Sequence, residues 1–232
     1  MDMSLISRCE RIPQRNAKED EILKLHTKEL YEKLKSTESE EDSKKLEKLS
    51  GEYEAIYIHP KTFECAMSAA GSAIELINSV VQDKIQNGMG IIRPPGHHAM
   101  KNEFCGYCFF NNAALAAQHA VENLSVKRVL IVDWDVHHGQ ATQRMFYDDP
   151  RVLYFSIHRY EHGTMWPWLR ESDFDQVGNS AGKGYNFNLP LNMTKMKNED
   201  YLAIFHQVLL PVAYEVIYYI FVNFLQEKDN IY

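Results

Sequence analysis

The hydrophobic and polar positions divide the chain into two parts that meet near Tyr53. Residues 1–52 are rich in charge, and in EDEILKLHTKELYEKLK the apolar residues recur at helical spacing on one face: Ile22, Leu23, Leu30 and Leu34. The next stretch, STESEEDSKKLEK, is almost wholly polar and is typical of a solvated segment. This pattern predicts a charged helical rim over residues 1–52, outside the core.

From Tyr53 onward, predicted strands and helices alternate. The helical patterns are TFECAMSAAGSAIELINSVVQ, FFNNAALAAQHAVENL and NEDYLAIFHQVLL. The strand patterns are GMGIIRPP, which runs into a loop, RVLIVDWD, RVLYFSIH and YNFNLPL. Such alternation indicates a mostly parallel sheet with helices on both faces. No internal repeat is present.

Composition narrows the class of protein. The 232 residues are enough for one α/β domain. The formal net charge is −7, and the lysines and arginines are mixed with acids, which argues against a nucleic-acid surface. The most apolar stretch, LAIFHQVLLPVAYEVIYYIFVNFL, contains polar residues and a proline, so we expect no membrane span. Four cysteines and no N-terminal signal favour a reducing compartment, cytoplasmic or also nuclear.

The stretch VLIVDWDVHHG places acids and histidines directly after a buried strand. Parallel strands bring such residues to a crevice at their carboxyl ends. Extended backbone turns Asp133, Asp135 and His137 to one side and alternates them with Trp134, Val136 and His138. Oxygen and nitrogen ligands two residues apart suit zinc. The alternative is that the acids cap a helix and the histidines pair with them in a polar network.

A second candidate is IIRPPGHHA, in which a strand runs into a turn stiffened by prolines before His97 and His98. An imidazole can act as base and then as acid, so this pair suits proton transfer. The alternative is a pair of ordinary loop histidines. Two strand ends of one sheet, one with metal ligands and one with proton carriers, together predict metal-assisted hydrolysis.

Five motifs resemble the zinc-dependent histone deacetylases: RPPGHHA, GYCFFNNAALAA, VLIVDWDVHHGQATQ, DDPRVLYFSIHRYEHGTMWP and GKGYNFNLPLN. They extend over roughly Cys9 to Glu215 and resemble most the class IIb branch, to which the first catalytic domain of invertebrate histone deacetylase 6 belongs. The resemblance implies an arginase-like α/β fold, here incomplete, with a mostly parallel sheet flanked by helices. It also implies hydrolysis of acetyl-lysine amides to lysine and acetate, with Zn²⁺ as the catalytic ion and K⁺ as a structural ion.

The same resemblance assigns roles to the polar residues of the two stretches. Asp135 and His137 match two of the family's three zinc ligands. His98 matches the general base, and His97 matches its electrostatic partner. Asp133 matches the carboxylate that orients His97, a role that fixes the ring and its tautomer.

Further positions follow from the resemblance. Gln140 matches the amide that faces the other histidine in the class IIb branch. Tyr107 and Trp166 match the aromatic walls of the tunnel for the lysine stem; the alternative for both is core packing. A CxxC pair, Cys105 and Cys108, has no second pair to make a zinc site, so we expect thiols on the tunnel wall. The potassium site matches Asp133, Asp135 and Ser156.

After Glu215 the sequence departs from the family pattern. The family continues with a strand bearing SAGFD, whose aspartate is the third zinc ligand, and later with a tyrosine that hydrogen-bonds the substrate carbonyl. This chain reads VIYYIFVNFLQEKDNIY, in which no apolar strand places Asp229, and its N-terminus is also short. We therefore expect a partial deacetylase domain over residues 1–215, with its sheet core from residue 53, a divergent tail over 216–232, and an exposed sheet edge. A fragment or an alternative transcript product fits this pattern.

Two classes of function remain. One is a deacetylase of acetylated proteins such as histones or tubulin, with acetylpolyamines as alternative substrates. The other is a catalytically inactive deacetylase-like module, since a missing ligand and a missing tyrosine predict little turnover by the chain as given. A ureohydrolase with two manganese ions needs further carboxylates that the chain lacks. We expect neither nucleic acid nor membrane as partner, and a second deacetylase domain or partner in a longer form.

Overall fold

The chain folds around a four-stranded, all-parallel sheet, seen in a computed structural model that describes residues 5–216 and 221–224. The strand order is β3-β2-β1-β4. The strands are β1 (Val129–Asp133), β2 (Val152–Arg159), β3 (Asn186–Leu191) and β4 (Phe221–Phe224). The first three confirm the strands predicted at RVLIVDWD, RVLYFSIH and YNFNLPL. Asp229 lies outside the described residues.

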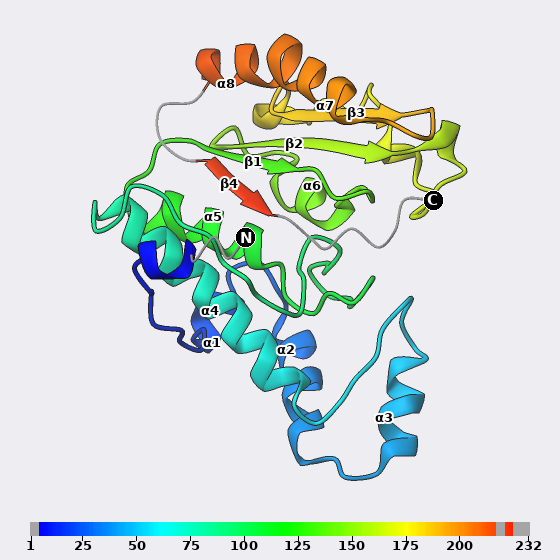
Figure 1. Cartoon of the computed structure of the whole chain (residues 1–232). Coiled ribbons are helices and arrows are strands. Elements are labelled where there is room, and N and C mark those ends of the chain that lie inside the picture. Colours follow the sequence, from blue (N-terminus) through cyan, green and yellow to red (C-terminus); the bar gives the residue numbers. More distant parts are fainter. Residues whose placement is uncertain (1–4, 217–220, 225–232) are drawn as a thin grey trace.

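Helices cover both faces of the sheet, as predicted (Figure 1). One face carries α7 (Asn198–Ile204) and α8 (Leu210–Val216), joined through a π-helical segment, Phe205–Leu209. The other face carries α4 (Thr62–Val81), α5 (Asn112–Asn123) and α6 (Gln140–Phe146). Short 3₁₀ helices occupy Leu5–Arg8, Thr37–Ser39, Glu161–Gly163, Arg170–Ser172 and Ser180–Gly182.

Strand alternation explains why both faces are covered. In β1, Val129 and Ile131 pack with α4 and α5, whereas Leu130 and Val132 pack with the α7–α8 side. Every residue of β1 is buried, because successive side chains point to opposite faces and both faces are covered by helices.

The N-terminal segment belongs to the core, so the predicted rim is wrong. It forms α1 (Glu19–Ile22), α2 (Lys28–Ser36) and α3 (Ser43–Ser50). Ile22, Leu30 and Leu34 are buried in a cluster with α4 and Phe110. The fourth predicted apolar residue, Leu23, is partly buried and packs against this cluster. The charged residues lie on the outer faces of these helices. A narrow apolar stripe on the inner face is enough to pack the helices against the core, so the high charge of the segment was a misleading signal.

Two predictions about the sheet are also wrong. The segment GMGIIRPP forms no strand, and Met89 and Ile91 are exposed. A strand needs a neighbour to pair its backbone groups, and no described strand lies beside this segment. Conversely, β1 has a neighbour where an exposed edge was expected, because β4 pairs with it in parallel from Leu130–Phe221 to Asp133–Phe224. No described helix has the length and apolar character needed to cross a membrane.

Candidate active site

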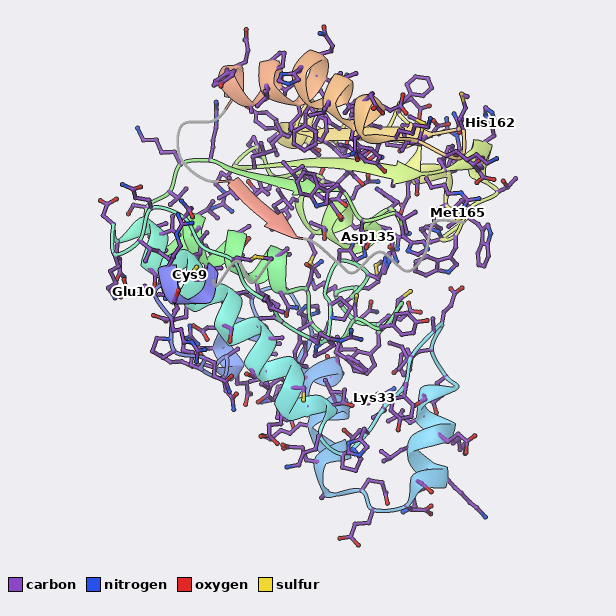
Figure 2. The ribbon with its side chains drawn as sticks, viewed as in Figure 1. Cys9, Glu10, Lys33, Asp135, His162 and Met165 are labelled. Atoms are coloured by element: carbon purple, nitrogen blue, oxygen red, sulfur yellow. The ribbon has the colours of Figure 1, made fainter. Side chains whose placement is uncertain are left out.

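Two loops meet at the carboxyl end of the sheet and bring the predicted polar residues together. Asp133 is the last residue of β1, and Asp135 and His137 lie in the loop that follows. His97 and His98 lie in a separate loop ahead of α5. Figure 2 shows Asp135 beyond the end of β1, on the side of the sheet where the loop with Met165 also projects. The predicted convergence of the two stretches is therefore present.

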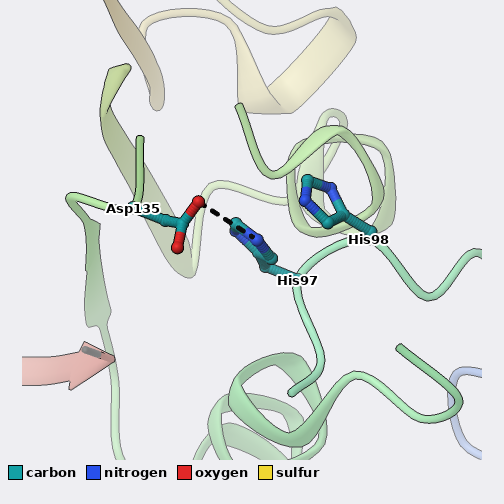
Figure 3. Close-up of side chains that lie close together, drawn as sticks. All are labelled: His97, His98 and Asp135. Atoms are coloured by element: carbon teal, nitrogen blue, oxygen red, sulfur yellow. Dashed lines mark ion pairs between the residues drawn. The ribbon is translucent and has the colours of Figure 1, made fainter. Parts of the chain in front are cut away.

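His97 lies between two carboxylates. Its Nδ1 donates to Asp133 Oδ2 at 2.8 Å, and its Nε2 lies 3.8 Å from Asp135 Oδ1 (Figure 3). Nε2 is buried and has no hydrogen-bond partner among the residues that the structure describes. Burial alone lowers the pKa of His97, but the charge and hydrogen bond of Asp133, with the charge of Asp135, together raise it above its ordinary value.

His98 lies directly beside His97, with ring centroids 3.8 Å apart. Its Nδ1 faces Gln140 Oε1 at 2.7 Å, and because an amide oxygen only accepts, Nδ1 carries the proton. Burial, reinforced by the charge of His97, holds the pKa of His98 well below its ordinary value. His98 is thus held as a neutral imidazole that carries its proton on Nδ1, which leaves Nε2 as the unprotonated nitrogen. Both histidines are buried, which excludes ordinary exposed loop histidines.

Asp135 and His137 also face each other. Asp135 Oδ1 lies 3.3 Å from His137 Nδ1 and accepts the His137 backbone N–H at 2.8 Å. Burial raises the pKa of Asp135, but the His137 hydrogen bond and the charge of His97 bring it below its ordinary value. Among the described residues no side chain caps the first turn of α6, so the acids do not cap this helix. The other part of that alternative is present, because His97 pairs with Asp133 and His137 with Asp135, and each acid accepts a local backbone N–H.

The donor set fits a zinc ion. His97, His98 and Asp135 each offer a ligand atom, and these atoms lie within 4.8 Å of one another. The Asp135 carboxylate is buried and His137 Nδ1 lies 3.3 Å from its Oδ1, and oxygen and nitrogen donors of this kind are those that zinc prefers. His137 lies outside this group of three, but its Nδ1 faces the same carboxylate.

Sequence reasoning missed two residues that hold Asp133. The Tyr154 hydroxyl donates to Asp133 Oδ2 at 2.7 Å, from within an apolar strand that carried no signal of this role. A Cβ at Gly139 would lie 2.4 Å from Asp133 Oδ2 and 2.5 Å from the Tyr154 hydroxyl, so only glycine fits there. The glycine directly after DWDVHH was a visible signal of close approach.

The two predicted tunnel aromatics border the histidines. The Trp166 ring lies edge-on to two histidine rings, with centroid distances of 4.5 Å to His98 and 5.2 Å to His137. Its indole N–H donates to Glu54 Oε1 at 2.7 Å. Tyr107 is 60% exposed and follows Gly106, where a Cβ would lie 2.9 Å from the Trp166 ring. Neither ring is buried in a core cluster, so the core-packing alternative is not supported.

The remaining predicted residues lie on buried sides of the site. Cys105 and Cys108 are buried thiols, and burial raises the pKa of Cys105 to about 11. Gln140 Nε2 lies 3.8 Å from Cys105 Sγ, which places this thiol beside the histidine pair. Ser156 pairs with Asp133 across β1 and β2, and its hydroxyl lies 2.8 Å from His158 Nδ1.

Metal-dependent hydrolases combine a proton acceptor with metal ligands. Here a histidine pair supported by Asp133 lies beside Asp135 and His137 at the carboxyl edge of a parallel sheet. The family model "Histone deacetylase domain" matches residues 1–218. The chain belongs to the histone deacetylase family.

Individual relatives agree with the class IIb branch. The chain is 48% identical over 211 residues to human "Polyamine deacetylase HDAC10", covering 91% of this chain and 31% of that protein. It is 39% identical over 209 residues to "Histone deacetylase 6" of Caenorhabditis elegans, covering 89% and 22%. The crystal structure of the HDA15 HD domain superposes with a TM-score of 0.79 at 34% identity, covering 91% of this chain and 56% of that one. The chain thus spans less than a third of these curated relatives' length.

Proposed function

We propose that this site hydrolyses N-acetyl amides of primary amines, with acetyl-lysine in proteins as the substrate. The observation that carries the proposal is His98, which is protonated on Nδ1 and held beside His97, in a group of three with Asp135 whose ligand atoms lie within 4.8 Å of one another. A proton acceptor next to candidate metal ligands is the arrangement that amide hydrolysis requires.

The roles of the side chains follow from their contacts. Asp135 and His137 would hold zinc, which would supply Lewis acidity at the acetyl carbonyl when bound. His98 Nε2 takes the proton of the attacking water and returns it to the leaving amine, while Gln140 fixes its tautomer. His97, whose pKa is raised beside Asp133, supports this transfer electrostatically.

The aromatic rings select a slender substrate. Trp166 borders the histidines, and Tyr107 follows Gly106, which packs against His98; both rings offer apolar faces to an aliphatic stem. A lysine side chain and a polyamine both provide such a stem. The relatives named polyamine deacetylases favour acetylpolyamines as a second substrate class. We further propose a K⁺ site at Asp133, Asp135 and Ser156, and action in the cytoplasm and also the nucleus.

We also propose that this 232-residue chain turns over slowly by itself. Asp135 and His137 match two of the family's three zinc ligands, whereas catalytic zinc sites normally supply three protein ligands. The family tyrosine that hydrogen-bonds the substrate carbonyl is also unmatched in this sequence. Loss of one such donor to the developing oxyanion lowers the rate by about 10²–10³-fold. The chain would then bind its substrate better than it converts it.

The test assays the zinc-loaded chain with an acetyl-lysine peptide and with an acetylpolyamine, beside a His97→Ala/His98→Ala control. Slow, zinc-dependent release of acetate that the control abolishes supports both proposals. Turnover at a rate typical of enzymes supports the function but refutes slow turnover. No zinc binding by equilibrium dialysis, together with no acetate release, refutes the assignment of the site.

A further inference from the structure

His26 is a buried histidine that joins the N-terminal segment to the loop of the histidine pair. It lies in the turn between α1 and α2 and is 2% exposed. Its Nδ1 lies 2.9 Å from the Met100 carbonyl oxygen, and its Nε2 accepts the Asn111 backbone N–H at 3.0 Å. Because one partner accepts and the other donates, His26 is a neutral tautomer with its proton on Nδ1.

The loop that carries His97 and His98 is held at both ends. At its start, Asn112 Nδ2 donates to the Pro94 carbonyl at 3.0 Å. At its end, His26 Nδ1 donates to the Met100 carbonyl oxygen, and the Thr27 backbone N–H donates to the Lys101 carbonyl oxygen at 2.8 Å. The histidine pair therefore lies between two clamps, of which the second comes from a segment more than 70 residues away.

The hydrogen bond between His26 and Asn111 also connects His26 to α6, the helix that carries Gln140. Asn111, which His26 binds through its backbone, donates from Nδ2 to Thr142 Oγ1 at 2.9 Å. Thr142 lies on α6, whose first residue is Gln140, the partner of His98. His26 thus ties together the loop that carries His98 and the helix that orients its ring.

We propose that His26 is a positioning residue for the histidine pair. By bridging the Met100 carbonyl and the Asn111 N–H, it sets the end of the loop so that His98 Nδ1 meets Gln140. The proposal rests on the proposed function only in assigning proton transfer to the pair. The orientation of His98 itself is measurable without zinc, substrate or turnover.

Three variants of the full chain separate positioning from simple stabilisation. His26→Phe keeps a ring that can pack against Phe110, 5.5 Å away between centroids, but loses both hydrogen bonds. His26→Gln keeps one donor and one acceptor on a single side chain. Leu34→Ala removes bulk from the same hydrophobic cluster and leaves both bonds in place.

The readouts are the imidazole ¹⁵N spectrum of His98 and the amide hydrogen exchange of residues 99–101. In the wild type we expect one tautomer of His98, protonated on Nδ1. His26→Phe should mix the tautomers and speed exchange in this loop at least tenfold, with β1 and β2 unchanged. His26→Gln should restore the wild-type spectrum, and Leu34→Ala should keep it despite a lower unfolding free energy.

Two results would overturn the proposal. One is a wild-type His98 spectrum and loop exchange in folded His26→Phe. The other is the same loss of tautomer in Leu34→Ala, which would show that any weakening of the core suffices. If His26→Phe does not fold, His26→Asn replaces it, because the shorter amide reaches only one of the two backbone groups. Identical spectra for His26→Asn, His26→Gln and the wild type then refute the proposal.

Discussion

Mild acid should destabilise this fold through two histidines that are buried in neutral form. Burial lowers the pKa of His26 to about 4 and that of His158 to about 4. An unfolded histidine has a pKa of about 6.5, so between about pH 6.5 and pH 4 the unfolded chain binds protons that the native chain does not. Stability is therefore full above about pH 6.5 and falls as the pH drops through this window.

The size of the effect follows from the two pKa values. The difference between about 6.5 and about 4 corresponds to about 3–4 kcal/mol for each histidine. Together the two amount to about 7 kcal/mol, which is comparable with the whole unfolding free energy of a domain, about 5–15 kcal/mol. Midway through the window, each histidine contributes a slope of about 1 kcal/mol per pH unit.

Urea unfolding at pH 7, 6 and 5 measures these slopes. His26→Gln removes one titrating group and should reduce the slope near pH 5 by about 1 kcal/mol per pH unit. Leu34→Ala provides the control, since it removes no titrating group and should lower the unfolding free energy without changing the slope. Equal slopes for the wild type and His26→Gln would refute the reasoning, because the His26 pKa would then be the same folded and unfolded.

Three further substitutions test the supports of the site. Gly139→Ala places a Cβ 2.4 Å from Asp133 Oδ2 and should lower the unfolding free energy by about 1–3 kcal/mol in urea, whereas wild-type stability would contradict the close packing. Tyr154→Phe removes a donor to a buried carboxylate and should cost about 1.5–3 kcal/mol by the same assay. Asn112→Ala frees the Pro94 carbonyl and should speed hydrogen exchange of the loop around His97; unchanged exchange would show that this clamp is dispensable.

The sequence predicted the parts of the fold that have strong local patterns. Continuous apolar runs identified β1, β2 and β3, and helical spacing identified α4 and α5. The pattern was misleading where an element depends on its neighbours. GMGIIRPP has the composition of a strand but no described strand to pair with, and β4 occupies a place that its own sequence did not predict.

The candidate site was predictable because its residues occur in two short motifs. Asp133, Asp135 and His137 follow the apolar run of β1, as predicted. His97 reaches Asp133 and Asp135 at the same edge of the sheet, although the segment before it forms no strand. The supports were harder to predict, since they come from distant segments. Nothing in the pattern around His26 indicates that both its nitrogens bind backbone groups of other loops.

The pairing of β4 with β1 shows that the sheet can be extended beside β1 without supplying a further metal ligand. The family strand expected at this point would supply both a neighbour for β1 and a carboxylate ligand. Here Phe221–Phe224 provides the neighbour, with Phe224 opposite Asp133, yet its sequence FVNF contains no acid. Backbone pairing does not depend on side-chain identity, whereas a ligand requires a carboxylate at the strand's carboxyl end. A stable sheet is therefore compatible with a weak zinc site, and the stability of this chain measured without zinc does not report its zinc affinity.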